Sequence, residues 1–273
     1  MSDTKNSVLP DIIEPMSNAI QQNIPETAKQ ADEALSTVVG FFNNVVLYPV
    51  KKANLTFRYK MESFEDDLKK KIKNIPEENL QVPPVRITGP VLEALRYAYD
   101  EDELREMYEE MLASAMDNRK VKQVHRSYVD AVRQMEPLDA QVLCRINNYN
   151  QITAVHVKMY LAESQQEYYI DAMPYHYNAL LCDLGDPFQI SASISNLLRL
   201  GLLISTLGIL SEGVAEQIEK EGYIQKRFEL FSQQQGGARI AVSGDCDIIS
   251  LDSYGRNFVD VCISKKEIEN NGN

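Results

Sequence analysis

The sequence predicts a mainly α-helical protein with a smaller α+β part. Residues 85–146 carry four consecutive helical patterns, in which apolar residues return every three or four positions. After residue 150 the pattern changes to the alternation of a half-buried strand, and short strand-like runs recur near the C-terminus. We therefore expect an amphipathic helical bundle followed by a module that mixes helices and strands.

Three of the four helices expected in residues 85–146 have a start signal. Pro90 suits the first position of the first helix, where its missing N–H costs nothing. Asp100 is expected to cap the second helix, with Glu103 completing a capping box. The third pattern starts near Val124, and Pro137 is expected to start the fourth helix.

The second of these helices has the clearest apolar stripe. Its residues recur at positions i, i+3, i+4, i+7, i+8 and i+11, which predicts that one side of the helix is buried. The predicted core residues are Leu104, Met107, Tyr108, Met111, Leu112 and Ala115. Glu109 and Glu110 fall on the opposite face, which we expect to be in water.

Changes in composition and the positions of helix-breaking residues divide the chain into five segments. The first residues are rich in Ser, Asn, Gln and Pro, a composition typical of mobile chain ends. The expected segments are a flexible leader (1–25), amphipathic helices (26–75), the central helical block (76–150), an α+β module (151–265) and a flexible tail (266–273).

The α+β module has a recognisable order of elements. We expect a strand over 152–161, a helix that starts at Asp186-Pro187, runs through Gly201 and ends in the run LGLLIS, an acidic helical insertion (212–231), two short strands (239–243 and 248–251) joined by a turn, and a last helix after Tyr254. A helix, a β-hairpin and a closing helix in this order resemble a winged helix-turn-helix, with 138–146 as its first helix and 190–200 at the recognition-helix position.

The net charge and the cysteine pattern limit the possible ligands and the possible cell compartment. The 273-residue chain has a formal net charge of −12, which argues against general binding to polyanions, because neutralising phosphates requires a basic face. The four cysteines show no CxxC spacing, so free thiols in a reducing cytosol are expected. The polar N-terminus does not resemble a secretory signal.

Several segments resemble the bacterial Abi-alpha family, named for abortive infection. They include Gly89-Pro90, the run DEDELREMYEEMLASAMD, the entry to the next helix at 125–128, and the start at 137–140. Near the C-terminus, NLLRLGLL (196–203) and SYGRNFVDVCI (253–263) match as well. The resemblance implies a role in phage defence and brings no catalytic residues with it.

The winged-helix interpretation raises DNA binding as an alternative function. The expected reading helix offers Ser193, Asn196 and Arg199 as candidate contacts for nucleic acid or for a protein partner. A helix that reads DNA is usually flanked by several Lys or Arg residues that bind phosphates, and this segment has only one basic residue. Nucleic acid is therefore the less favoured partner.

A second alternative is a peripheral membrane protein anchored by residues 35–73. Lys51, Lys52, Arg58 and Lys60 follow an apolar segment, and a basic amphipathic helix of this kind can lie on an anionic membrane surface. The apolar segment itself is too short and too polar to span a bilayer. The competing interpretation is a core-facing helix with a solvated outer face.

No motif in the sequence predicts catalysis or a cofactor. It has no glycine-rich phosphate loop, no HExxH and no GxSxG. The histidines His125, His156 and His176 lie in unrelated contexts, and Asp245 and Asp247 are better explained as turn residues than as metal ligands.

We therefore expect a non-enzymatic bacterial defence protein without cofactor or metal. Its expected partner is an unidentified protein, either phage-derived or the chain itself. The expected location is the cytoplasm, with attachment to the inner membrane face as the alternative.

Overall fold

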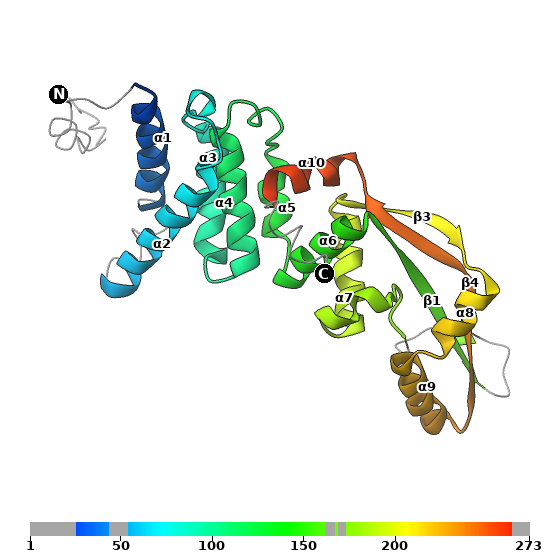
Figure 1. The fold of residues 1–273 in the computed structure, drawn as a ribbon. Helices are drawn as coiled ribbons and strands as arrows, with labels where there is room; N and C mark the ends of the chain where they lie inside the picture. Colours follow the sequence, from blue (N-terminus) through cyan, green and yellow to red (C-terminus); the bar gives the residue numbers. More distant parts are fainter. Residues whose placement is uncertain (1–25, 44–53, 162–166, 169–172, 264–273) are drawn as a thin grey trace, which may run out of the picture.

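The computed structural model describes residues 26–43, 54–161, 167–168 and 173–263, and all structural statements below concern these residues. The molecule is elongated, with a helical bundle at one end and an antiparallel sheet at the other (Figure 1). The expected leader, the tail and the lysines Lys51 and Lys52 lie outside the described residues.

Two N-terminal helices pack against the bundle. Helix α1 spans Glu26–Phe42 and α2 spans Asn54–Ile72. Phe42 and Phe64 stack with ring centroids 4.0 Å apart, and Leu68 is fully buried one turn further along α2. Aromatic stacking stabilises a contact beyond the burial of apolar surface alone, so these side chains hold the two helices together.

The central bundle follows, with α3 (Val85–Ala98), α4 (Asp102–Met116), α5 (Ser127–Arg133) and α6 (Pro137–Tyr149), preceded by the short 3-10 helix η3 (Glu77–Asn79). The six predicted core residues of α4 are all buried, which confirms the stripe. Glu109 was expected in water, and this expectation is wrong: the residue is 1% exposed, because α2 packs along that side of α4.

Three helix starts differ from the prediction, and one of them is that of α5, which begins at Ser127 instead of near Val124. Helix α3 begins at Val85 and runs through Pro90, which removes one backbone hydrogen bond without ending the helix. Buried residues on both sides of Pro90, such as Ile87 and Val91, hold the helix in place. Helix α4 begins after Glu101, and no side-chain cap forms there.

The start of α6 agrees with the prediction. Pro137 occupies the first turn, and Asp139 Oδ2 accepts a hydrogen bond of 2.9 Å from the backbone N–H of Glu136. The carboxylate thus satisfies one of the N–H groups that a helix start leaves unpaired and complements the helix dipole.

The sheet contains four antiparallel strands in the order β2-β1-β4-β3. Strand β1 spans Gln151–Leu161, β2 Glu167–Tyr168, β3 Leu203–Ile209 and β4 Ala238–Leu251. The strand predicted over 152–161 is confirmed. The two short C-terminal strands prove to be one long strand, β4, and its neighbour β3 forms where the sequence suggested the end of a helix.

The same part of the chain contains five helical elements: η4 (Ala179–Leu184), α7 (Pro187–Arg199), α8 (Glu212–Glu219), α9 (Gly222–Gln235) and α10 (Ser253–Cys262). A large hydrophobic cluster extends from the N-terminal helices through α7 and α10 to the near end of the sheet, where it includes Ile152 and Ile249. A smaller cluster lies between α9 and the far end, around Val157 and Ile224. The bundle and the sheet module therefore share one core.

Candidate functional site

Strand β3 forms an unprotected edge of the sheet. Its sequence, LISTLGI, favours a strand because it is rich in β-branched and apolar residues. Among the described residues it pairs with β4 on one side, and no strand pairs with its other side. The strand contains no charge and no proline, the devices by which proteins usually protect a sheet edge.

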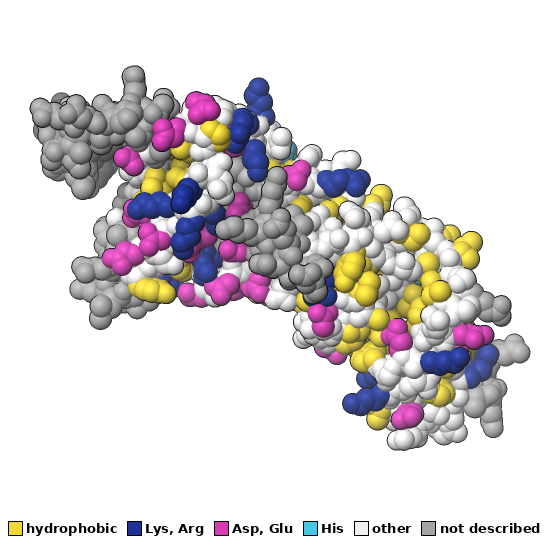
Figure 2. All heavy atoms as spheres, in the orientation of Figure 1, with side chains coloured by type: hydrophobic (Ala, Val, Ile, Leu, Met, Phe, Trp, Pro, Cys, Tyr) yellow, Lys and Arg dark blue, Asp and Glu magenta, His cyan; other side chains and the backbone are white. Residues whose placement is uncertain are grey.

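Large apolar side chains project from this edge into solvent. Ile204 is 46% exposed, Leu207 78% and Ile209 85%. Figure 2 shows hydrophobic and uncharged side chains over the part of the module where β3 and β4 lie, whereas Lys, Arg, Asp and Glu gather over the helical half. An edge of this kind can accept an extended chain by backbone pairing, with its side chains supplying apolar contact.

A row of polar side chains crosses the sheet beside this edge. Ser205 on β3 donates a hydrogen bond of 2.8 Å to Asp247 Oδ1 on β4. Asp247 Oδ2 lies 3.2 Å from His156 Nε2 on β1 and 3.4 Å from Nδ1 of the buried His176. Burial lowers the pKa of His176 below its ordinary value, against the opposing effect of Asp247. The row links β3 to β1 through a single carboxylate.

This arrangement corrects two sequence-based interpretations. Asp247 lies within strand β4 and not in a turn. His156 and His176, which the sequence leaves unrelated, meet at its carboxylate. The Ser205 hydroxyl is directed at a carboxylate instead of an imidazole, so it lacks the histidine base that activates a nucleophilic serine.

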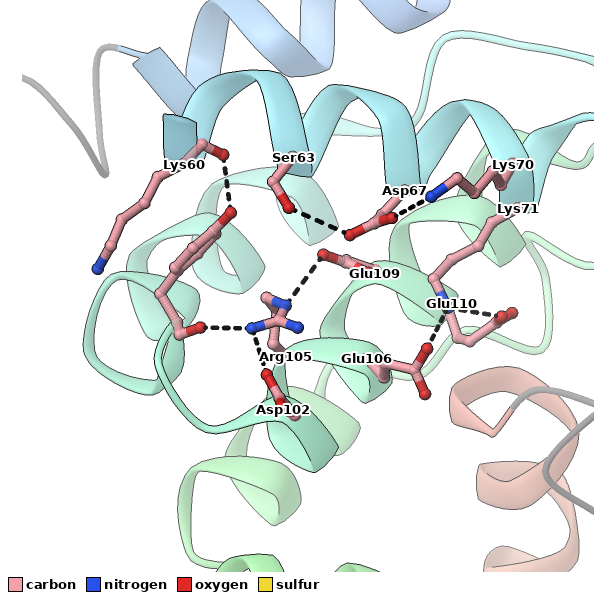
Figure 3. A network of polar contacts seen from close by, with 11 residues as sticks. Lys60, Ser63, Asp67, Lys70, Lys71, Asp102, Arg105, Glu106, Glu109 and Glu110 are labelled. Atoms are coloured by element: carbon pink, nitrogen blue, oxygen red, sulfur yellow. Dashed lines mark hydrogen bonds and ion pairs between the residues drawn. The ribbon is translucent and has the colours of Figure 1, made fainter. Parts of the chain in front are cut away.

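A second polar constellation joins α2 to α4 around Glu109 (Figure 3). Arg105 binds Asp102 at 2.7 Å and donates to the Tyr99 carbonyl at 3.0 Å. The distance from Arg105 Nε to Glu109 Oε1 is 3.7 Å, too long for a hydrogen bond, and this buried oxygen has no other partner among the described residues. Burial raises the pKa of Glu109 to about 7, although Lys71 and Arg105 act in the opposite direction.

Lys71 is the main cationic link between the same helices. It reaches from α2 to Glu110 at 3.0 Å and to Glu106 at 3.7 Å (Figure 3). These residues line a cleft of about 480 Å³ between α2, α4 and α10. Charges of both signs alternate in the cleft, and Arg119 on its rim is paired with Asp117. The cleft is therefore an ion-paired seam between helices. It does not present the excess of positive or negative charge that would attract a charged ligand.

The part of the chain that the structure describes has no candidate metal site. No three His, Cys, Asp or Glu side chains there, Asp247, His156 and His176 included, are arranged to hold a metal ion. All four cysteines are free, with Cys246 and Cys262 buried.

Comparison with known proteins supplies the family. A model of the family described as abortive infection alpha matches residues 56–262. The chain belongs to the abortive infection alpha family. The match covers nearly all of α2 and every later element through α10, so the β3 edge and the α2–α4 seam are both parts of the family domain. Neither a curated protein nor a solved structure matches the chain.

Within this family domain, the predicted contact residues of α7 lie at an internal interface. Ser193 is 4% exposed. Asn196 donates to the Gln134 carbonyl at 2.9 Å and to Asp139 Oδ2 at 2.8 Å. Arg199 is exposed but donates to Gln134 Oε1 at 3.0 Å. The structure brings Asn196 and Arg199 together at the junction of α5 and α6.

The predicted membrane-contact residues are only partly described. Lys51 and Lys52 lie outside the described residues, and so does the side chain of Arg58. Lys60 Nζ pairs with Asp100 at 2.7 Å and lies 5.0 Å from the centre of the Tyr99 ring. Where the structure describes the chain, none of its helices combines the length and the apolar composition needed to cross a bilayer.

The exposed residues of β3 were not predicted, because the expected helix ended in the run LGLLIS, which includes Ile204, and residues 206–209 were given no element. The signal that could have revealed them is the run from Leu203 to Ile209. It has three β-branched residues and no charge, and it lies between the helix-ending Gly201 and the polar Ser211.

Proposed function

We propose that this member of the abortive infection alpha family defends bacteria against phage without catalysis, by binding a protein partner through β3. The family match supports the defence role. The exposed, uncharged edge with Leu207 and Ile209 in solvent supports the binding role, and it is the observation on which the proposal depends. The proposed location is the cytoplasm, where phage proteins are made.

The energetics of such an edge are adequate for specific binding. Full burial of Leu207 and Ile209 contributes about 3 to 6 kcal/mol in total. Each backbone hydrogen bond added along the edge contributes about 0.5 to 1.5 kcal/mol net. Together these gains can offset an association cost of about 4 to 15 kcal/mol, provided that the partner fits the edge over most of its length.

We also propose that the C-terminal module is winged-helix-like. The order α6, β1, η4, α7, β3, β4 supports this, as does the strand order β1-β4-β3. In this interpretation α8 and α9 occupy the position of the wing, and α7 that of the reading helix. Because Ser193 is buried and Asn196 is bonded within the fold, the proposed partner of the module is a protein and not DNA.

Phage plating tests the defence role. A phage-sensitive bacterium that expresses the chain should give fewer plaques than the same strain with an empty vector, for at least one phage of a broad panel. Equal plating on every phage of the panel, with the protein present and soluble in the cells, would contradict the proposal.

A further inference from the structure

We infer that the occupant of the β3 edge is β3 of a second copy, paired antiparallel across a two-fold axis to make one continuous sheet. The inference rests on the proposed function, since it names the protein that the edge binds. Pairing of this kind is isologous, so both copies use the same surface, the commonest arrangement in soluble oligomers.

The residue sizes along β3 match those of its own antiparallel copy. An axis through Thr206 places Ser205 opposite Leu207 of the second copy and Ile204 opposite Gly208, because opposite residues of antiparallel strands share a face. Two of the bulky exposed side chains, Ile204 and Leu207, then meet a small residue. Leu203 lies opposite Ile209, so an apolar contact closes each end of the paired strands.

Apolar exposure continues on both faces of the sheet at this edge. Because side chains alternate along a strand, Ile204 belongs to one face, while Leu207 and Ile209 belong to the other. Val214 on α8, which follows β3 in the chain, is also 41% exposed. Stable interfaces bury roughly 1,200 to 2,000 Å² of accessible surface. A paired edge with apolar side chains on both faces buries side-chain surface in addition to backbone surface, as an interface of that size requires.

Charge favours this surface over others for self-association. Two copies of a chain with a net charge of −12 repel one another, and the repulsion falls with distance and with salt. Most of the visible charge lies on the helical half, at the opposite end of the elongated molecule from β3 (Figures 1 and 2). Pairing through β3 keeps the two helical halves apart and brings together strands that carry no charge.

Sedimentation of the purified full chain tests the inference with a matched pair of variants. Leu207→Lys places a charge on the edge, and Val85→Lys places the same charge on a comparably exposed apolar residue of the helical half. The wild type and Val85→Lys should dimerise at micromolar concentration, and Leu207→Lys should raise the dimer Kd at least tenfold, a change of about 1.4 kcal/mol. Circular dichroism checks that each variant is folded.

A cysteine variant tests the register without depending on the lysine variant. In the proposed dimer the two Thr206 residues face one another with Cα atoms about 4.5 to 5.5 Å apart, within disulfide range. Oxidised Thr206→Cys should form linked dimers well above the wild-type background. Ser211→Cys should not, because the two copies of that residue lie near opposite ends of the paired strands.

A wild type that remains monomeric throughout the micromolar range overturns the inference, and so does a dimer that persists in Leu207→Lys without Thr206→Cys cross-links. Either result leaves the proposed function separately testable. If Leu207→Lys still loses phage protection that Val85→Lys retains, then β3 binds a different protein. If both variants protect fully, binding through β3 fails as well.

Discussion

Gly255 on α10 lies directly against the backbone of Leu202, the residue that precedes β3. A Cβ atom on Gly255 would lie 1.9 Å from the Leu202 carbonyl oxygen and 2.8 Å from its carbonyl carbon. The N–H of Gly255 donates to Asp252 Oδ1 at 2.7 Å, which fixes the start of the helix. The two C-terminal segments that resemble the Abi-alpha family, 196–203 and 253–263, therefore meet at this glycine, which anchors α10 beside the start of the exposed strand.

Gly255→Ala should strongly destabilise the fold. The obstacle is backbone and not a flexible side chain, so α10 or Leu202 must move, and we expect a loss of about 3 kcal/mol or more. Urea denaturation followed by circular dichroism measures the loss. Gly40→Ala is the control: it lies on the exposed side of α1, and its added Cβ meets no other segment within 4 Å, so it should gain about 0.5 to 1 kcal/mol. Equal stability of the two variants would contradict the close contact.

Glu109→Gln should change how stability depends on pH. The folded-state pKa of about 7 lies above the ordinary value of 4.5, so between these values the folded chain binds the proton more tightly than the unfolded chain does. The free energy of unfolding therefore falls as pH rises through this window, by about 3 kcal/mol from this group. Glutamine mimics the protonated acid, so the variant should match the wild type near about pH 5 and exceed it near about pH 8.

Urea titrations at both pH values measure this effect. Glu110→Gln provides the control, because Glu110 is paired with Lys71 and partly exposed, and its loss should leave no gain in stability at high pH. A Glu109→Gln variant that is less stable than the wild type near about pH 8 would show that the carboxylate is held ionised by its neighbours.

Asn196→Ala should cost about 1 to 3 kcal/mol, because it removes a hydrogen bond from the buried Asp139 carboxylate and another from the Gln134 carbonyl. Arg199→Ala should cost less than about 0.5 kcal/mol, since its guanidinium is exposed. Chemical denaturation distinguishes the two. A gel mobility-shift assay with random duplex DNA at low salt tests the alternative. If the wild type shifts the DNA and Arg199→Ala does not, α7 binds nucleic acid and the protein-partner proposal is wrong.

The full chain should remain at the bottom of a flotation gradient with anionic liposomes. Lys60, the one described side chain of the predicted basic contacts, is already paired with Asp100 and lies close to the Tyr99 ring. Flotation that is lost in a Lys51→Gln, Lys52→Gln double variant would instead favour the peripheral membrane alternative.

The sequence predicted features that depend on local periodicity. The stripe from Leu104 to Ala115 is long and regular, so its burial could be read directly from the spacing. The run around Ile204 could not be assigned in this way, because a short apolar segment after a helix fits either a helix end or a strand. Gly244 and Asp245 suggested a turn, but β4 continues through them: Asp245 pairs with Ile209 of β3, although the pairing with β1 is interrupted there by a bulge between Val155 and Val157.

The candidate site was harder to predict because it depends on contacts between residues distant in the chain. Glu109 has a polar side chain on the polar side of α4, and only the packing of α2 buries it. His156 and His176 meet because a loop folds back beside β1, where Val155 bridges to Tyr177. No periodic pattern within one element encodes such contacts.

The most direct test of the central claim is phage plating on strains that express the wild type, Leu207→Lys or Val85→Lys at equal soluble levels. If the β3 edge binds the partner that defence requires, the wild type and Val85→Lys reduce plating equally. Leu207→Lys then returns plating to the level of the empty vector. A folded Leu207→Lys protein that protects as well as the wild type would contradict the claim.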